Sequence, residues 1–561
     1  MLPASTKTNP CEISVVQKLR SFVFCALILE CLSVSLYAAS GDLDQDFGID
    51  GKVQINLGGA NSANAVGIQS DGKIILAGSN GTKFALIRYN TDGSLDQTFG
   101  SGGQVLTSFA VFSIAFALAI QPDGKIVVVG SDGSCCRFAI ARYNTDGSLD
   151  STFGAGGKVT TNFGGDVEAF AVSIQSDGKI ILVGGPGGFF IVRYQTNGDL
   201  DPTFGTGGTV VTNFGGEFNA ANGVALQKDG KIIVGGGIGA ANNFGVARYK
   251  VDGSLDDGFG DGGKVVQQDF GDFVPVNAIA VQSDDKIVAL GWNFTVVRYN
   301  PNGDLDTNFG TDGELPPQLD PPIIGGIASA LAVQANGKIV VTGSVSSPVD
   351  ESFGIVRYNA DGTLDQTFGV NGQVATDFDA PSNSCPPSFI NCSNDQAKAV
   401  AIQTDGKIVV AGGAGACNPP CGFAVARYIG DISFSSFGSK LKITPSTHKD
   451  KGAAFKVKID FTLSGESDGL DPISDSVSFQ IGSFFAILPA GSFHQVKDRD
   501  FEYSGILNGI TIEAQIRLLS HGNGIFTTKI RGASLDPAPD LIPVTLTIGN
   551  DTGSTAVISS K

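Results

Sequence analysis

Residues 88–100 read Arg88-Tyr89-Asn90-Thr91-Asp92-Gly93-Ser94-Leu95-Asp96-Gln97-Thr98-Phe99-Gly100, and this stretch decides the fold. It returns in five later copies, at Arg142 to Gly154, Arg193 to Gly205, Arg248 to Gly260, Arg298 to Gly310 and Arg357 to Gly369. Spacing of this kind indicates an internal repeat of roughly 50 residues, which is within the range of propeller repeats.

Each unit predicts four short strands. In the first complete unit these are 65–69, 74–78, 84–89 and 103–107, which are apolar runs separated by Asp-Gly and Gly-Gly turns. Helical periodicity is nearly absent beyond residue 40, and Gly is abundant, with 77 in the 561 residues. The chain is therefore predicted to be all-β.

The repeats are out of phase by one strand. The Asp-Gly-Lys type of turn, the Arg-Tyr pair and the Leu-Asp-x-x-Phe-Gly phrase each occur seven times, but the first phrase, at Leu43, precedes any Arg-Tyr pair. Closing a ring leaves no open sheet edge. We therefore expect a seven-bladed β-propeller over residues 41–437, in which 41–57 supplies the outer strand of the last blade.

These residues carry a resemblance. The unit Ala-x-Gln-x-Asp-Gly-Lys-Ile followed by Phe-x-x-x-Arg-Tyr-Asn-x-Asp-Gly-x-Leu-Asp-x-x-Phe-Gly resembles the bacterial delta-60 repeat. The resemblance covers 41–437 and ends in a decayed eighth phrase at Asp431 to Gly438. It implies a β-propeller and a secreted protein, and it implies no activity.

Residues 438–561 contain no repeat. Apolar and polar residues alternate over 455–461, 476–481, 510–516 and 543–548. A period of two indicates half-buried strands, so we expect a small C-terminal β-sandwich, which resembles C-terminal β modules of other secreted bacterial proteins.

Residues 1–40 have the pattern of a secretory signal peptide. Lys18 and Arg20 precede an apolar run over 21–36, and small residues follow it. We expect a secreted, periplasmic or cell-surface protein with no membrane span after the signal is removed. The formal charge of −18 argues against nucleic acid as a partner.

Six cysteines remain after the signal. An even number in an exported chain suggests disulfides, although the pairing is open and zinc is the alternative. The disulfide candidates are Cys135, Cys136, Cys385, Cys392, Cys417 and Cys421.

The repeated phrase also resembles a calcium loop, with Asn90, Asp92, Gly93 and Asp96 at suitable positions. However, Arg88 occupies the first ligand position, and a guanidinium there can pair with Asp96 instead. We therefore expect an ion-free turn, no metal and no cofactor. The three histidines all lie in the C-terminal region, which excludes His-dependent catalysis within the repeats.

The connections that vary in length between copies all belong to one face of the expected disc. The longest lie in the sixth and seventh units, at 344–352, 377–396 and 412–422. Irregular loops on a rigid scaffold are where binding residues concentrate. The candidate ligand-binding residues are Asp350, Glu351, Asp379, Phe389, Asn391, Asp395 and Asn418.

These patterns favour a non-catalytic binding protein with a protein or glycan ligand. One alternative is a carboxylate-based enzyme acting on extracellular polysaccharide, because propellers also carry paired-carboxylate sites. The other is a structural component of an envelope or matrix. No reaction is fixed by a motif, so no catalytic residue is predicted.

Overall fold

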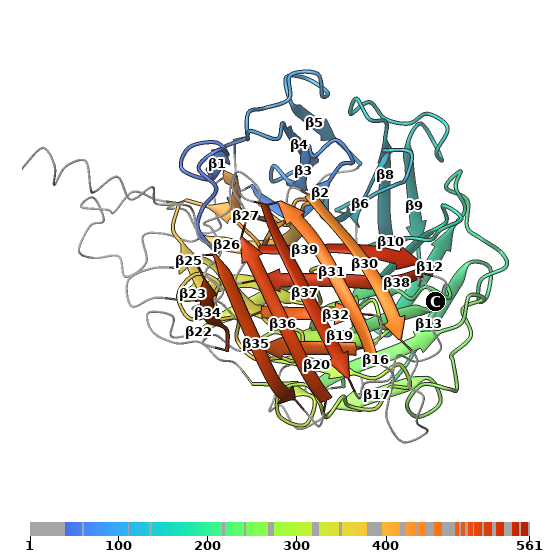
Figure 1. Cartoon of the computed structure of the whole chain (residues 1–561). Coiled ribbons are helices and arrows are strands. Elements are labelled where there is room, and N and C mark those ends of the chain that lie inside the picture. Colours follow the sequence, from blue (N-terminus) through green and yellow to red (C-terminus); the bar gives the residue numbers. More distant parts are fainter. Residues whose placement is uncertain are drawn as a thin grey trace, which may run out of the picture. The chain divides into compact units, whose positions relative to one another are not determined.

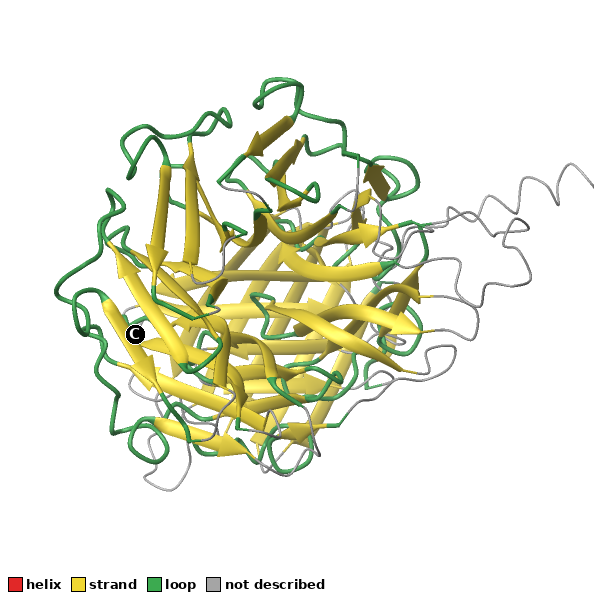
Figure 2. Cartoon of the chain, turned by 180° about the vertical axis from the view of Figure 1, so that it is seen from behind, coloured by secondary structure: helices red, strands yellow, loops and turns green. Residues whose placement is uncertain are grey.

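The fold is all-β in a computed structural model of the chain. The structure describes residues 40–58, 61–109, 112–133, 137–165, 167–215, 219–239, 243–267, 274–316, 325–346, 351–378, 395–415, 422–433, 436–444, 454–462, 477–481, 484–488, 492–497, 499–507, 510–518, 523–531, 541–548 and 551–558. Figure 2 shows strands and loops but no helix over these ranges. They accordingly contain no apolar helix that could cross a membrane.

Seven four-stranded antiparallel sheets make up the repeat region. Each begins with a strand that contacts the next sheet, here called the inner strand. The inner strands are β2 (Ser62–Ile68), β6 (Ile114–Ile120), β10 (Glu168–Ile174), β14 (Asn219–Leu226), β18 (Val276–Val281), β22 (Gly325–Val333) and β26 (Gln396–Ile402). The second strands are β3 (Ile74–Ser79), β7 (Ile126–Ser131), β11 (Ile180–Gly185), β15 (Ile232–Ile238), β19 (Ile287–Gly291), β23 (Ile339–Ser346) and β27 (Ile408–Ala414).

The third strands carry the Arg-Tyr pair at their ends. They are β4 (Phe84–Tyr89), β8 (Arg137–Tyr143), β12 (Phe189–Tyr194), β16 (Asn243–Tyr249), β20 (Val296–Tyr299), β24 (Glu351–Tyr358) and β28 (Gly422–Tyr428). Six outer strands follow directly, namely β5 (Gln104–Thr107), β9 (Lys158–Asn162), β13 (Thr209–Thr212), β17 (Lys264–Gln267), β21 (Glu314–Leu315) and β25 (Gln373–Thr376).

The outer strand of the last sheet comes from the other end of the repeat region. Strand β1 (Lys52–Ile55) pairs antiparallel with β28, with Lys52 opposite Ala426 and Ile55 opposite Phe423. The order of that sheet is β1-β28-β27-β26, as the early phrase at Leu43 predicts. Since β26 and β27 also contact β2, the succession of sheet contacts returns to its start. Figure 1 shows the label of β1, from the blue end of the chain, in the same region as that of the orange strand β27 of this sheet.

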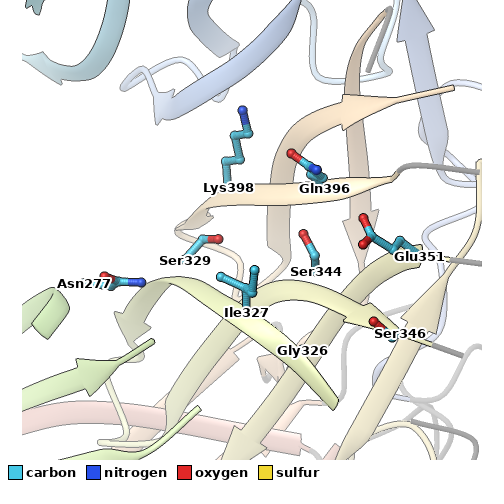
Figure 3. Close-up of a pocket in the computed structure, with 9 residues that line it drawn as sticks. All are labelled: Asn277, Gly326, Ile327, Ser329, Ser344, Ser346, Glu351, Gln396 and Lys398. Carbon is cyan, nitrogen blue, oxygen red and sulfur yellow. The ribbon is translucent and has the colours of Figure 1, made fainter. Parts of the chain in front are cut away.

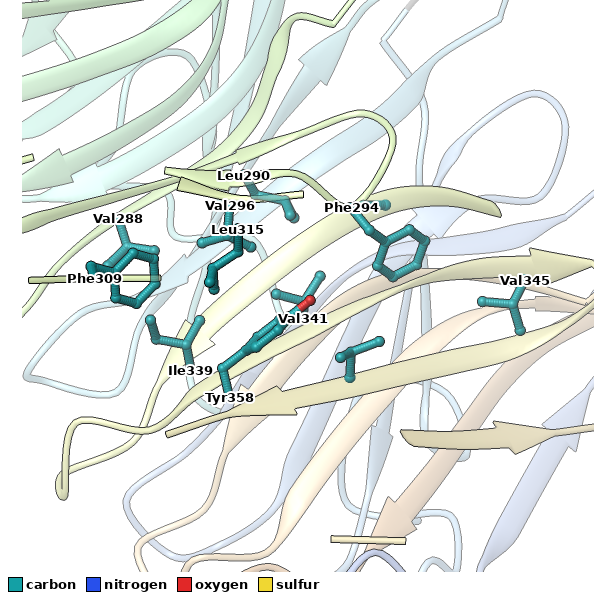
Figure 4. Close-up of a cluster of buried hydrophobic side chains, with 12 residues drawn as sticks. Val288, Leu290, Phe294, Val296, Phe309, Leu315, Ile339, Val341, Val345 and Tyr358 are labelled. Atoms are coloured by element: carbon teal, nitrogen blue, oxygen red, sulfur yellow. The ribbon is translucent and has the colours of Figure 1, made fainter. Parts of the chain in front are cut away.

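Neighbouring sheets are held together by apolar side chains. Figure 4 shows one such layer, in which Leu290, Phe294 and Phe309 of the fifth sheet pack with Val341 and Tyr358 of the sixth. The second and third strands are buried on both faces, since they lie between two sheets. Burial on both faces explains why the second and third strands are continuous apolar runs in the sequence.

The repeated phrase is a charged clamp at one end of each sheet. Arg88 Nε donates to Asp96 Oδ2 at 2.8 Å, and its guanidinium lies 4.4 Å from the centre of the Phe99 ring. Lys73, from the Asp-Gly-Lys turn, lies 3.0 Å from the same carboxylate. Arg88 Nη1 donates to the carbonyl of Thr145 in the next sheet. The expected Arg–Asp pair is confirmed, and it joins adjacent sheets as well as the turn.

The clamp of the seventh sheet is completed by the early phrase. Arg427 Nε donates to Asp44 Oδ2 at 2.6 Å, and Lys407 lies 3.1 Å from that oxygen. The Arg427 guanidinium lies 4.6 Å from the ring of Phe47. Asp44 and Phe47 therefore take the places that Asp96 and Phe99 hold in the first sheet.

The decayed eighth phrase has a structural role as well. Its carboxylate, Asp431, lies 2.9 Å from Arg357 Nη2 and 3.0 Å from Lys338 Nζ in the sixth sheet. The other arginines donate through Nη1 to a carbonyl of the following sheet, as Arg88 does to Thr145. Arg357 instead binds Asp431 through Nη2, and its Nη1 has no hydrogen-bond partner among the described residues.

The C-terminal residues form two further sheets. One contains β29 (Ile432–Ser433), β39 (Asp551–Ile558), β38 (Leu541–Ile548), β32 (Val477–Ile481) and β33 (Phe484–Leu488). The other contains β30 (Ser436–Thr444), β31 (Ala454–Thr462), β37 (Asn523–Arg531), β36 (Ile510–Leu518), β35 (Asp500–Leu507) and β34 (His494–Lys497). The rings of Phe479 and Phe526 join the two sheets, with centroids 5.3 Å apart.

Candidate ligand-binding site

Every inner strand carries a β-bulge at the same place. The register shifts by one residue near the start of each strand, between Ala63 and Ala65 in the first copy. The residues at the shifts are Asn64, Phe116, Phe170, Asn222, Asn277, Ser329 and Lys398. A bulge bends the strand and redirects its side chain. These seven positions, here called the bulge series, are therefore a candidate surface at the inner strands.

Amides of the bulge series link one inner strand to the next. Asn64 Nδ2 donates to the carbonyl of Ala115 at 2.8 Å, and Asn277 Nδ2 donates to that of Ala328 at 2.8 Å. In each case the acceptor precedes the bulge residue of the following strand. Inner strands have an unpaired edge, so such a donor satisfies a carbonyl that no strand covers.

The bulge series is not chemically uniform. Phe116 and Phe170, on consecutive inner strands, pack edge to face with their centroids 5.6 Å apart. The members on β22 and β26 are instead a hydroxyl and an ammonium, Ser329 and Lys398. The inner strands therefore present an aromatic arc and, several sheets away, a polar one.

Lys398 is the cation of the polar arc. Its Nζ donates to Ser62 Oγ at 2.9 Å and to Asn64 Oδ1 at 3.1 Å, both on β2. Burial lowers the pKa of Lys398, and neither acceptor is ionised. Because an ammonium has three N–H groups, one donor remains beyond these two acceptors.

A cavity of about 430 Å³ opens beside the polar arc. Figure 3 shows Gln396 and Lys398 on β26, with Ile327 and Ser329 on the strand β22. Asn277 and Gly326 also line it. Its remaining walls are Ser344 and Ser346 at the end of β23 and Glu351 at the start of β24, where Ser346 pairs with Glu351.

The cavity lies at the ends of strands where the connections vary in length. Strands β23 and β24 are joined by 347–350, and β26 follows the long connection after β25. Of the candidate ligand-binding residues, Glu351 lies in the cavity wall. Asp350, Asp379, Phe389, Asn391 and Asn418 lie outside the described residues, so their predicted role stays a prediction.

Asp395 has a different environment from Glu351. Its side chain is completely buried, and its carboxylate accepts hydrogen bonds from the backbone N–H groups of Phe378 at 2.8 Å and Gly415 at 3.1 Å. These bonds tie Phe378 and Gly415, each of which precedes a variable connection, to one carboxylate. The arrangement suits a fixed base for the loops better than direct contact with a ligand.

All six disulfide candidates, from Cys135 to Cys421, fall on residues outside the described ranges. Within those ranges no group of three or more His, Cys, Asp and Glu side chains is arranged to hold a metal ion. The expectations of disulfides and of an ion-free turn therefore remain predictions.

A second cavity, of about 350 Å³, lies at the opposite ends of the strands. Its lining includes Gln69, Lys407 and Arg427, which belong to the repeated turns and clamps. Since these residues recur in every copy and hold the sheets together, the cavity is a feature of the scaffold.

The sequence does contain a signal for the bulge series, which the repeat analysis missed. Six of the seven bulge residues stand between two residues no larger than Ala, as in Ala63-Asn64-Ala65 and Ala397-Lys398-Ala399. The residue before the bulge is completely buried in every copy, whereas the bulge residue itself changes from copy to copy. A variable residue between two small ones, the first of them buried, marks the bulge.

Comparison with known proteins finds solved structures and a family model that are similar to this chain. Two similar solved structures are of YCF48, one from Cyanidioschyzon merolae (12% identity, TM-score 0.38, covering 67% of this chain and 98% of that one) and one bound to D1 peptide (10%, 0.40, 70% and 100%). Another is the extracellular domain of the putative one component system BT4673 from B. thetaiotaomicron (12%, 0.36, 87% and 57%). No curated protein matches the sequence.

Six segments match the family model described as "Domain of unknown function (DUF5122) beta-propeller", at 69–99, 121–153, 175–204, 227–259, 282–309 and 334–368. Each segment runs from the end of an inner strand to the Phe of the clamp, so the bulge series lies outside the match. The matched segments and the repeated four-stranded sheets identify the repeat region as a β-propeller.

Proposed function

We propose that this β-propeller is a non-catalytic binding protein, with its ligand held in the cavity beside the polar arc. One observation carries the proposal: the cavity wall contains side chains with unused hydrogen-bonding capacity. Ser329, Ser344, Ser346 and Glu351 form no side-chain hydrogen bond with any other described residue. Polar groups that converge on a concave surface without internal partners are typical of a ligand site.

The proposal includes a finer account of the architecture. The seven four-stranded sheets are the blades of one closed propeller, and the pairing of β1 with β28 supports this closure. The two C-terminal sheets form a β-sandwich, which the contact between Phe479 and Phe526 supports. The delta-60 resemblance and the pattern of residues 1–40 favour an exported protein at the cell surface or in the periplasm.

An enzyme acting on polysaccharide is a weaker candidate. Glycoside hydrolysis ordinarily requires two carboxyl groups about 5–10 Å apart across the bond that is cleaved. Among the described residues of the cavity wall, Glu351 is the one carboxylate. The acidic clamp residues such as Asp96 are paired with Arg and Lys at the opposite ends of the strands.

The test compares binding and hydrolysis in the same variants. The full chain would be screened on protein and glycan arrays and assayed for release of reducing ends. We expect binding that is lost when residues 381–392 are replaced by a Gly-Ser linker, and that is weakened at least tenfold by Glu351→Gln. The control is Asp284→Asn, an exposed turn residue at the opposite ends of the strands, which leaves binding unchanged. Release of reducing ends, or binding that survives both cavity-side variants, would overturn the proposal.

A further inference from the structure

The fifth blade has an unusual turn between its second and third strands. Residues 291–295 close it within five positions, with Gly291 N–H donating to the carbonyl of Thr295 at 2.7 Å and Phe294 N–H to that of Gly291 at 3.3 Å. Phe294 has a φ of 68°, in the left-handed region that bulky side chains avoid. A strained backbone at one residue is kept when the surrounding structure requires it.

The packing around Phe294 explains why its strained backbone is kept. Its ring is completely buried in the core between the fifth and sixth blades (Figure 4). The space beside Gly326 is also occupied by this ring, since a Cβ at Gly326 would lie 3.1 Å from Phe294 Cε2. Gly326 belongs to the cavity wall. The turn is therefore anchored directly behind the cavity.

The same turn carries the single tryptophan of the chain. The carbonyl of Trp292 accepts a hydrogen bond from the N–H of Ala328 at 2.8 Å. Ala328 stands between Ile327 and Ser329, which both line the cavity. Trp292 is 43% exposed although Phe294, two residues later, is buried. The turn thus buries the Phe294 ring in the core, leaves the Trp292 indole partly exposed, and is bonded to the strand β22 that lines the cavity.

Trp292 and the residues of the cavity wall offer apolar and polar groups together. Trp292 and Ile327, which is 44% exposed, supply apolar surface. The hydroxyls of Ser329, Ser344 and Ser346 each offer a donor and an acceptor, and Glu351 offers acceptors only. A ligand that matches this set has a rigid apolar face and many hydroxyl groups around its edge.

We propose that the cavity and Trp292 form a saccharide-binding subsite. A sugar ring stacks its C–H face on the indole and directs its hydroxyls to the serines and Glu351. The inference deepens the proposed binding function and rests on it. A phosphorylated or sulfated ligand fits less well because the cavity wall has one ammonium, Lys398, and two acceptors on β2 already engage it.

A peptide also fits less well. Extended peptides are held by main-chain hydrogen bonds to a sheet edge together with apolar pockets for alternate side chains. The polar groups here are side-chain hydroxyls, and the inner edges beside the cavity are engaged at Ala328 by the Asn277 amide. The cavity volume is within the range of small-molecule sites, about 300–1,000 Å³.

The single tryptophan makes the subsite directly observable. Intrinsic fluorescence of the full chain would be titrated with hexasaccharides of β-1,4-glucose, β-1,4-N-acetylglucosamine, α-1,4-glucose and α-1,6-mannose, and with a panel of acidic and basic peptides. We expect at least one saccharide to change the emission saturably and to protect Trp292 from quenching by acrylamide. Measured by calorimetry, the affinity for that saccharide falls at least tenfold in Trp292→Ala and falls less in Trp292→Phe.

The matched control is Phe112→Ala, which removes another exposed aromatic residue, 58% exposed, from the start of the second blade. It leaves saccharide affinity unchanged, and circular dichroism checks that every variant is folded. Peptide binding without saccharide binding would overturn this inference and leave the binding function standing. Saccharide affinity that is unchanged in both Trp292 variants would also overturn it. If neither saccharides, peptides nor the arrays give a ligand, the proposed function itself fails.

Discussion

Asp44→Asn tests what holds β1 against β28. The carboxylate of Asp44 accepts from Arg427, which is 383 residues away in sequence, and from Lys407. Burial raises the pKa of Asp44, but the charges of Arg427 and Lys407 outweigh burial, so the net shift is downward and the group is ionised at neutral pH. Asparagine keeps the shape and removes the charge.

The expected loss of stability follows from the contacts that Arg427 keeps and the one that it loses. Its Nη1 still donates to the carbonyl of Thr91, and its guanidinium still stacks on Phe47, but Nε loses an ionised acceptor at 2.6 Å. Removing one partner of a buried ion pair costs about 3–5 kcal/mol. We therefore expect the free energy of unfolding to fall by that amount, as measured by urea denaturation.

A matched variant separates the effect on the pairing of β1 from the effect of losing one buried ion pair. Asp150→Asn removes the same contacts, to Arg142 at 2.8 Å and Lys125 at 3.1 Å, within a blade whose strands follow one another in sequence. We expect both variants to lose similar stability, but in Asp44→Asn the amides of β1 exchange with deuterium faster than those of the other strands of its sheet. The reasoning is refuted if Asp44→Asn unfolds within about 1 kcal/mol of the native protein, or if β1 exchanges equally fast in both variants.

Three further perturbations follow from the contacts. Arg88→Lys keeps the charge but loses the bond to Thr145 and the planar stack on Phe99, so we expect a loss of about 1–3 kcal/mol in thermal unfolding, and a loss below about 0.5 kcal/mol would contradict the clamp. Phe294→Ala empties a buried site and costs about 3–5 kcal/mol in urea denaturation, whereas unchanged stability would mean that the ring does not anchor the turn. Burial opposes the shift at Asp365, but Arg357 and Lys338 lower its pKa to about 2. This pKa lies below the value of about 3.9 in the unfolded chain. The ionised Asp365 therefore stabilises the fold fully above about pH 3.9, and this stabilisation is lost as the pH falls towards about 2. In Asp365→Asn the free energy of unfolding should depend less on pH in this window. An unchanged dependence on pH would contradict the role of Asp365.

Much of the propeller was predictable because its constraints recur in the sequence. Four strands were expected at 65–69, 74–78, 84–89 and 103–107, and they appear as β2 to β5. The copy of the phrase at Leu43 predicted the pairing of β1, since it precedes any Arg-Tyr pair and a closed ring leaves no open sheet edge. Repetition makes such patterns recognisable, because the same physical requirement selects the same residues in each copy.

The candidate site was predictable only in its location. The variable connections pointed to the ends of the strands at which the cavity opens, and Glu351 lines that cavity. Lys398 and Ser329 were missed because a bulge inverts the alternation from which inward and outward positions are judged. Trp292 was missed because its turn is short, and length was the criterion for a functional loop.

The pairing of β1 with β28 also orders events during synthesis. Asp44 leaves the ribosome 383 residues before Arg427, which corresponds to roughly 20–75 s at translation rates of about 5–20 residues per second. Throughout that interval β28 does not yet exist, so β1 has an uncovered edge, the kind of edge that pairs with other chains. That edge is covered only once β28 has been made and pairs with β1.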